Sequence, residues 1–184
     1  MQKIKYLIVV DMQNDFVDGA LGTKEAQAIV PRVREIVKQK REEGYFIVFT
    51  QDTHYANYLK TNEGKHLPVE HCIDGTHGWE IVDGLFDPTR YPNRVRGDVC
   101  VQKHTFGYDA WGFVFGDTGF GVDVEEIELI GLCTDICVVS NALILKALYP
   151  EATIKVDSTA CSGVTPESHN AALTTMRMCQ IEVL

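Results

Sequence analysis

The sequence has no long hydrophobic run and no excess of positive charge, and each absence excludes a class of protein. A membrane-spanning helix needs about 20 consecutive apolar residues, and no stretch approaches that length. The formal net charge of -9 argues against nucleic acid or an anionic membrane as the main partner. The acidic residues are spread along the chain, which is typical of a soluble protein.

The six cysteines also lack the patterns of cysteine-rich proteins. No two of them are separated by two residues, which disfavours a structural zinc site. The N-terminus shows no secretory signal, because its first apolar run is short and ends at Asp11. We therefore expect reduced thiols and a cytoplasmic location. Since no repeat, linker or low-complexity tract is present, we expect one domain over residues 1–184.

The chain instead alternates strand-like and helix-like segments. Residues 4–10 and 45–50 are continuous apolar, β-branched runs, which are typical of strands buried on both faces. Between them, residues 24–43 repeat apolar side chains at helical spacing after Thr23, which can cap a helix. This order predicts a βαβ unit with parallel strands and a right-handed crossover.

The same alternation continues to the C-terminus and favours an α/β fold. A last helix is expected after Thr165, with Pro166 at its first position. Another is expected to end near Leu148. Further strands are expected at residues 99–103, 126–130, 152–156 and 181–184.

Residues 55–98 form a long stretch without regular periodicity. Such stretches in a compact domain are usually functional or disordered. Trp79, Leu85 and Phe86 supply the apolar side chains of a packed segment, so we expect a functional loop with one short helix near Trp79. The aromatic segment 106–115 that follows is expected to lie in the core or at a subunit interface.

Three predicted strands end at side chains that can do chemistry. Asp11 and Lys103 end two of them, and Cys137 follows a third, at the start of the next helix. The carboxyl ends of parallel strands share one edge of the sheet, so these groups can converge there. The positive end of the helix dipole is expected to lower the pKa of the Cys137 thiol.

Together these groups can perform nucleophilic catalysis. Cys137 can attack a carbonyl carbon, Lys103 can stabilise its thiolate, and Asp11 can carry a proton to the leaving group. The backbone N–H groups of Cys133 and Cys137 are placed to bind the oxyanion that forms. The alternative is a coincidence of a buried thiol, a paired acid and an extended lysine.

A second polar group follows the strand at residues 45–50. Asp52, His54 and His71 offer oxygen and nitrogen ligands that suit a divalent ion such as Zn²⁺, Mn²⁺ or Fe²⁺. Water or substrate could take the remaining positions. Surface polar residues without a metal are the alternative. Further candidate ligands nearby are Glu63, His66 and Glu70.

In family order, the motifs resemble those of the isochorismatase-like cysteine hydrolases, and most of all the nicotinamidases. The resemblance implies a three-layer α/β/α, Rossmann-like fold with a six-stranded, mainly parallel sheet. It also implies a cis peptide bond between Leu132 and Cys133. The stretches that carry it are L-I-V-V-D-M-Q-N-D-F (7–16), T-Q-D-T-H (50–54), H-C-I-D-G-T-H-G-W-E (71–80), Lys103 and G-L-C-T-D-I-C (131–137).

The resemblance also implies an activity. A catalytic triad of Asp11, Lys103 and Cys137 would convert nicotinamide to nicotinate and ammonia through a cysteine thioester. One divalent metal ion, Zn²⁺ in the first place, would hold the pyridine nitrogen. Phe16 and Phe106 are expected to line the substrate pocket. Because the family is often oligomeric, we expect a homo-oligomer that binds a small carboxamide. The implied metal ligands are Asp52, His54 and His71, with Glu63 as a candidate fourth.

Two positions depart from the nicotinamidase pattern. Leu67 precedes Pro68 where nicotinamidases usually have tryptophan, which changes the expected pocket wall. Cys133 replaces the common alanine of the oxyanion turn. A cysteine hydrolase for another small amide, ureide or N-carbamoyl compound is therefore the alternative. The intact triad disfavours a third hypothesis, a non-catalytic binding module.

Overall fold

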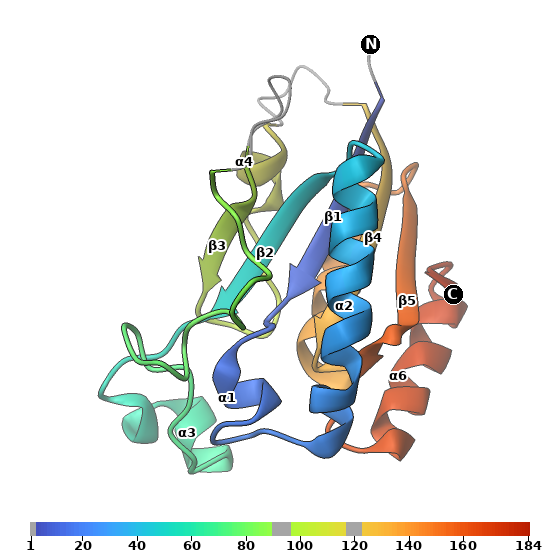
Figure 1. The fold of residues 1–184 in the computed structure, drawn as a ribbon. Helices are drawn as coiled ribbons and strands as arrows, with labels where there is room; N and C mark the ends of the chain where they lie inside the picture. Colours follow the sequence, from blue (N-terminus) through green and yellow to red (C-terminus); the bar gives the residue numbers. More distant parts are fainter. Residues whose placement is uncertain (1–2, 90–96, 117–122) are drawn as a thin grey trace.

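A computed structural model describes residues 3–89, 97–116 and 123–184. Within these residues, six strands form one sheet in the order β3-β2-β1-β4-β5-β6, and every pairing is parallel (Figure 1). The prediction of an α/β fold with a six-stranded parallel sheet is therefore confirmed. The strands are β1 (Ile4–Val10), β2 (Phe46–Asp52), β3 (Val99–Lys103), β4 (Val124–Leu132), β5 (Thr153–Ser162) and β6 (Glu182–Val183).

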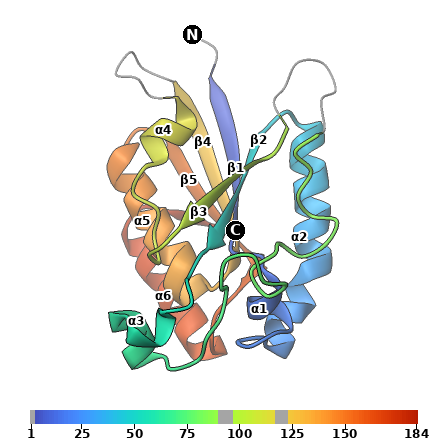
Figure 2. The ribbon, with the colours of Figure 1, turned by 90° about the vertical axis from the view of Figure 1, so that its left-hand side faces the viewer.

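Helices cover both faces of the sheet, which gives three layers. α1 and α2 lie on one face, and α4 and α5 lie on the other (Figure 2). Among the described residues, no helix is long and apolar enough to span a bilayer. The helices are α1 (Asn14–Val17), α2 (Lys24–Glu42), α3 (Asn62–His66), α4 (Trp111–Phe115), α5 (Val139–Leu148) and α6 (Pro166–Met178). Two further helical turns are a 3₁₀ turn (Tyr58–Lys60) and a π-helical turn (Thr134–Val138).

Local sequence accounts for where the long helices begin. The Thr23 hydroxyl accepts a hydrogen bond from the Ala26 amide at 2.9 Å and caps α2 as expected. Thr165 and Ser168 form a reciprocal capping box at the start of α6, with proline at the first turn. Satisfying these amides fixes the direction in which each helix leaves its loop.

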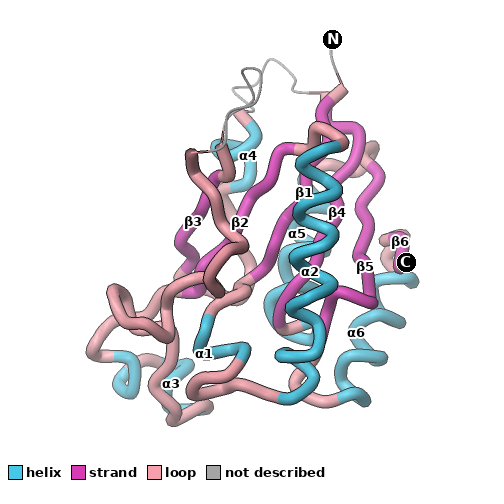
Figure 3. Tube along the Cα trace, viewed as in Figure 1, coloured by secondary structure: helices cyan, strands magenta, loops and turns pink. Residues whose placement is uncertain are grey.

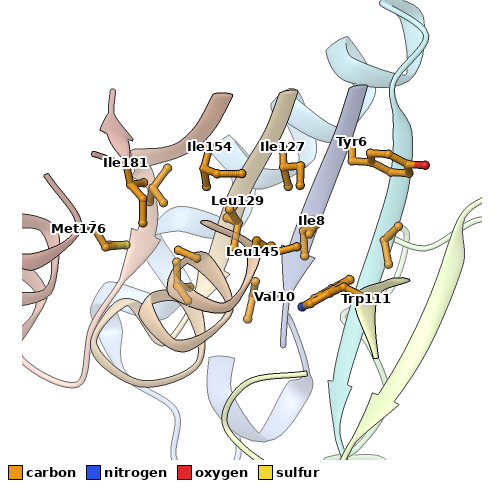
Figure 4. Close-up of a cluster of buried hydrophobic side chains, with 14 of the residues drawn as sticks. Tyr6, Ile8, Val10, Trp111, Ile127, Leu129, Leu145, Ile154, Met176 and Ile181 are labelled. Atoms are coloured by element: carbon orange, nitrogen blue, oxygen red, sulfur yellow. The ribbon is translucent and has the colours of Figure 1, made fainter. Parts of the chain in front are cut away.

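Side chains of β1 alternate between two hydrophobic cores. Leu7 and Val9 pack in the core beneath α2, whereas Ile8 and Val10 pack in the core on the other face, with Leu145 of α5 (Figure 4). This alternation follows from the two-residue repeat of a strand. Because both faces are covered, polar groups of β1 can emerge only at its ends.

The long segment between β2 and β3 corrects one prediction. Figure 3 shows it as mostly loop, and the helical residues in its described part are Tyr58–Lys60 and Asn62–His66 rather than the neighbourhood of Trp79. Trp79 lies in a turn in which its amide donates to the Thr76 carbonyl at 3.1 Å. The helix forms earlier because the Thr61 hydroxyl accepts from the Gly64 amide at 3.0 Å and caps it.

β5 is longer than the expected strand at residues 152–156. Its polar residues after Val156 are typical of a loop, yet the strand continues to Ser162. The register of its pairing with β4 is irregular at this point, and this irregularity accommodates the polar residues within the strand. There the Asp157 carboxylate accepts hydrogen bonds from the amide and the hydroxyl of Thr159, at 2.9 and 2.6 Å.

The aromatic segment divides between core and surface, which gives a matched test of core packing on α4. Trp111 is fully buried, whereas Phe113 is 91% exposed. We expect Trp111→Ala to lower the free energy of unfolding by about 3–5 kcal/mol because it opens a cavity. Phe113→Ala should change it by about 0.5 kcal/mol or less. Urea unfolding measures both, and equal losses would contradict the assignment of Trp111 to the core.

Candidate active site

The three side chains predicted to converge do meet at the carboxyl edge of the sheet. The Lys103 Nζ lies 2.7 Å from Asp11 Oδ2 and 3.5 Å from Cys137 Sγ. All three residues are buried. Residues distant in sequence thus form one acid–ammonium–thiol cluster, because their strands are parallel and end at the same edge.

Asp11 is held in place by the neighbouring strand. The Thr50 hydroxyl of β2 donates to Asp11 Oδ1 at 2.6 Å and accepts from the Asp11 amide at 3.1 Å. The backbone of Asp11 has a φ of 45°, a left-handed conformation that costs energy for a residue with a side chain. This turn takes the chain out of the sheet and leaves the carboxylate facing Lys103.

The turn that carries Cys137 differs in detail from the expectation. The peptide bond between Leu132 and Cys133 is cis, as the resemblance implied. However, a π-helical turn begins at Thr134, so Cys137 lies within this first helical turn rather than at its start. The Cys133 carbonyl accepts from the amide of Val138 at 3.0 Å. Four residues beyond Cys137, the Asn141 side chain donates to its carbonyl at 2.9 Å.

Burial controls the protonation of this cluster. Desolvation and the charge of the Asp11 carboxyl raise the pKa of the Cys137 thiol well above its usual value, although Lys103 counteracts them. The prediction that the pKa of this thiol is lowered is therefore wrong. Burial opposes the charge on Lys103, but Asp11, Cys137 and Asp52 outweigh it and hold its pKa high. Burial also raises the pKa of Asp11, although Lys103 counteracts it.

Beside this cluster, four possible metal ligands gather. One ligand atom from each of Asp52, His54, Glu63 and His71 lies within 4.8 Å of the others. The three predicted ligands are therefore together, and Glu63 joins them from the first turn of α3. The competing candidates His66 and Glu70 are both exposed.

The histidines of this group are arranged as a metal site requires. The His54 Nε2 is buried and, among the described residues, has no hydrogen-bond partner, although Asp52 Oδ2 is 2.9 Å away. The His71 Nδ1 bonds the Val69 carbonyl at 2.8 Å, which leaves its Nε2 facing Asp52 at 3.6 Å. Two imidazole nitrogens and carboxylate oxygens are a donor set that zinc favours, so these residues fit a divalent metal.

Asp52 belongs to both clusters. Its Oδ1 accepts from Lys103 Nζ at 3.1 Å, while Oδ2 faces the two histidines. Burial disfavours its charge, but the adjacent imidazoles of His54 and His71, together with the charge of Lys103, hold its pKa well below the usual value. One carboxylate therefore links the candidate metal site to the acid, ammonium and thiol.

A cavity of about 310 Å³ opens above both clusters. Phe16 and Phe106 both line it, as expected, and Leu67 forms part of the wall where nicotinamidases usually have tryptophan. Phe16 also packs edge-on against His71, with ring centroids 5.5 Å apart. The remaining apolar lining comes mainly from Leu21, Ala26, Leu132, Ile136 and Val164.

Sequence reasoning missed three side chains that hold the site together. Thr50 orients Asp11, Asn141 binds the carbonyl of Cys137, and Gln13 binds the backbone of Asp52. Thr50 and Gln13 both lie inside the stretches that carry the family resemblance. Asn141 follows Cys137 by one helical turn, a spacing that brings two side chains to one face.

Comparison with known proteins agrees with this geometry. The sequence model of the isochorismatase domain matches residues 5–184. The chain belongs to this family. A nicotinamidase of Saccharomyces cerevisiae is 24% identical, over 98% of this chain and 99% of the relative. A protein of Arabidopsis thaliana described as a probable inactive nicotinamidase is 27% identical, over 93% of this chain and 87% of the relative.

Solved structures of this family show the same fold. The pyrazinamidase of Pyrococcus horikoshii in complex with zinc superposes with a TM-score of 0.78 and 29% identity, and 98% of each chain is covered. The N-carbamoylsarcosine amidase of Thermoplasma acidophilum has a TM-score of 0.75 and 27% identity, over 98% of this chain and 95% of that one. This isochorismatase-family chain is a nicotinamidase-like hydrolase that acts on amides.

The charge state of His54 makes metal binding depend on pH. Burial opposes its protonation, but Asp52 and Glu63 outweigh burial and raise its pKa to about 9 in the metal-free protein. A proton must therefore leave before zinc binds, and affinity should rise by about tenfold per pH unit between about pH 6 and 8. Competition with a chromophoric chelator measures this. His66→Ala is the control, and a pH-independent affinity would contradict the prediction.

Proposed function

We propose that the protein hydrolyses nicotinamide to nicotinate and ammonia, with Cys137 as the nucleophile. The observation that carries this proposal is that Cys137 and candidate metal ligands, among them Asp52 and His71, line the same cavity. Its volume is at the lower end of the range for small-molecule sites, which suits a single aromatic ring. In the family resemblance, a metal pair of this kind distinguishes nicotinamidases from isochorismatases.

The candidate metal ligands would orient the substrate. Asp52, His54, Glu63 and His71 would hold a divalent ion, Zn²⁺ in the first place, whose Lewis acidity supplies a bond to the pyridine nitrogen. Phe16 and Phe106 would contact the faces or edges of the ring. The carboxamide would then lie beside Cys137, so that its carbon is presented to the sulfur.

The reaction would begin from a protonated thiol. Asp11 accepts the proton of Cys137 as the sulfur attacks the carboxamide carbon, and the ammonium of Lys103 stabilises the negative charge. Backbone N–H groups of Cys133 and Cys137 bind the oxyanion. Asp11 then gives the proton to the departing nitrogen, which leaves as ammonia, and a thioester remains.

Hydrolysis of the thioester uses the same acid. Asp11 removes a proton from water, whose oxygen attacks the thioester carbon. Collapse of this second tetrahedral intermediate breaks the bond to sulfur, the proton returns to Cys137, and nicotinic acid leaves and loses its carboxyl proton to solvent as nicotinate. The burial of Asp11 and its pairing with Lys103 support the proposal that it serves as base and acid in turn.

A second candidate is hydrolysis of another small amide, a ureide or an N-carbamoyl compound. Leu67 in the cavity wall favours it, because the usual tryptophan is missing there. A non-catalytic binding module is less consistent with the site, since Asp11, Lys103 and Cys137 are all present and meet. One domain over residues 1–184, assembly as a homo-oligomer and a cytoplasmic location stay predictions.

The substrate proposal can be tested by ammonia release. Nicotinamide should be deamidated, and stripping the metal with a chelator should lower kcat/KM by about tenfold or more, reversibly on adding zinc. Benzamide is the matched control: it lacks the ring nitrogen, so metal removal should affect it little. Cleavage of an N-carbamoyl amino acid with nicotinamide left intact would refute the substrate and leave the family unchanged.

Substitutions of the two cysteines in the oxyanion turn, Cys133 and Cys137, test the roles of nucleophile and backbone donor separately. Cys137→Ala should lower kcat by about 10³-fold or more, because no thioester can form. Cys133→Ala should keep most of the activity, since the alanine variant retains the backbone N–H. Steady-state rates, with circular dichroism to confirm folding, measure both. The reverse pattern would make Cys133 the nucleophile.

A further inference from the structure

Gln13 is a fully buried polar residue with no role in the proposed chemistry. Its carboxamide nevertheless makes three hydrogen bonds. The Nε2 donates to the carbonyls of Asp52 at 2.9 Å and Trp79 at 2.8 Å, and the Oε1 accepts from the amide of Asp52 at 2.8 Å. The side chain thus binds both backbone polar groups of Asp52.

The sheet explains why Asp52 needs such a partner. β2 continues to Asp52, whereas the neighbouring strand β1 ends at Val10 and Asp11 turns away. On the other side of β2, the amide of Thr53 donates to the Lys103 carbonyl of β3 at 2.9 Å. The carboxamide of Gln13 therefore takes the place of the next residue of β1, since it carries the same donor and acceptor as a peptide group.

The backbone around Gln13 also binds the loop that follows His71. The Val82 amide donates to the Met12 carbonyl at 2.9 Å, and the Asn14 amide donates to the Glu80 carbonyl at 3.0 Å. Gln13 itself forms an antiparallel bridge with Ile81. One residue therefore joins the exit of β1, the end of β2 and this loop.

We propose that Gln13 is a positioning residue that fixes Asp52 between Lys103 and the candidate metal ligands. The carboxylate of Asp52 has to reach Lys103 with Oδ1 and the two histidines with Oδ2. Fixing the backbone of Asp52 on both polar groups restricts the rotation and translation of that carboxylate. This inference rests on the proposed metal site and is independent of the identity of the amide.

Gln51 provides a matched control. Its Nε2 donates to the same Trp79 carbonyl at 3.1 Å, and it accepts from the Cys100 thiol at 3.0 Å. Like Gln13 it is buried, but its side-chain hydrogen bonds within the described residues go to Trp79 and Cys100 and not to the backbone of Asp52. Gln51→Met therefore removes a buried carboxamide and a contact to Trp79 while leaving Asp52 held.

The experiment measures the zinc affinity of the metal-free 184-residue chain without any substrate. Gln13→Met should weaken zinc binding about 10–100-fold, the usual effect of losing support behind a metal ligand. Gln51→Met should stay within about threefold of wild type. Gln13→Asn is a second variant for the case that methionine is not tolerated: it stays neutral and polar but is too short to reach Asp52, so it should also weaken binding about tenfold or more.

Cobalt(II) in place of zinc gives a second readout that loss of stability alone does not change. Its visible absorption bands report ligand geometry, and they should shift in the Gln13 variants and not in Gln51→Met. Zinc affinities of folded Gln13 and Gln51 variants that agree within about threefold would overturn the proposal, as would wild-type protein that binds no zinc. Zinc binding that depends on Gln13 while nicotinamide is left intact would refute only the substrate.

Discussion

The buried ammonium group of Lys103 is the interaction on which the site depends. It contacts Asp11, Asp52 and Cys137 at 2.7, 3.1 and 3.5 Å, and removing the ammonium would leave two carboxylates uncompensated in a low-dielectric interior. The fold can hold this group only because β3 ends beside β2, and β2 beside β1. The register of β2 and β3 places Asp52 directly opposite Lys103. Sheet pairing and electrostatics therefore specify the same arrangement.

Asp52 connects two groups of residues that appear as separate motifs in the sequence: the acid, ammonium and thiol, and the candidate metal ligands. Its carboxylate neutralises Lys103 on one side and faces the histidines on the other, so the proposed metal ligation and the proposed activation of the nucleophile would use the same charge. Such an arrangement leaves little tolerance for movement, because a shift toward one cluster is a shift away from the other. The backbone bonds from Gln13 restrict this movement, and the cavity lined by Phe16 and Phe106 lies above the fixed groups.

Much of this could be predicted because it depends on local pattern and on topology. Apolar runs and capping residues gave the strands and long helices, and parallel pairing implied that Asp11, Lys103 and Cys137 meet at one edge. Other features depend on which of several competing interactions forms, and the sequence does not show which one does. Thr61 caps a helix well before Trp79, and a strand irregularity absorbs the polar residues that follow Val156. Desolvation and the Asp11 carboxyl raise the pKa of Cys137, because that thiol is buried beside an acid rather than placed at an open helix end.

The sequence by itself determined the family, the parallel α/β sheet, and which residues carry the acid, the cation, the thiol and the imidazoles. These follow from residue type, periodicity and motif order. Tertiary structure alone decided that Glu63 rather than His66 or Glu70 joins the histidines, and that Gln13 completes the sheet edge at Asp52. Several equally suitable polar residues lie close together in the sequence. Only the path of the folded backbone decides which side chains come within bonding distance.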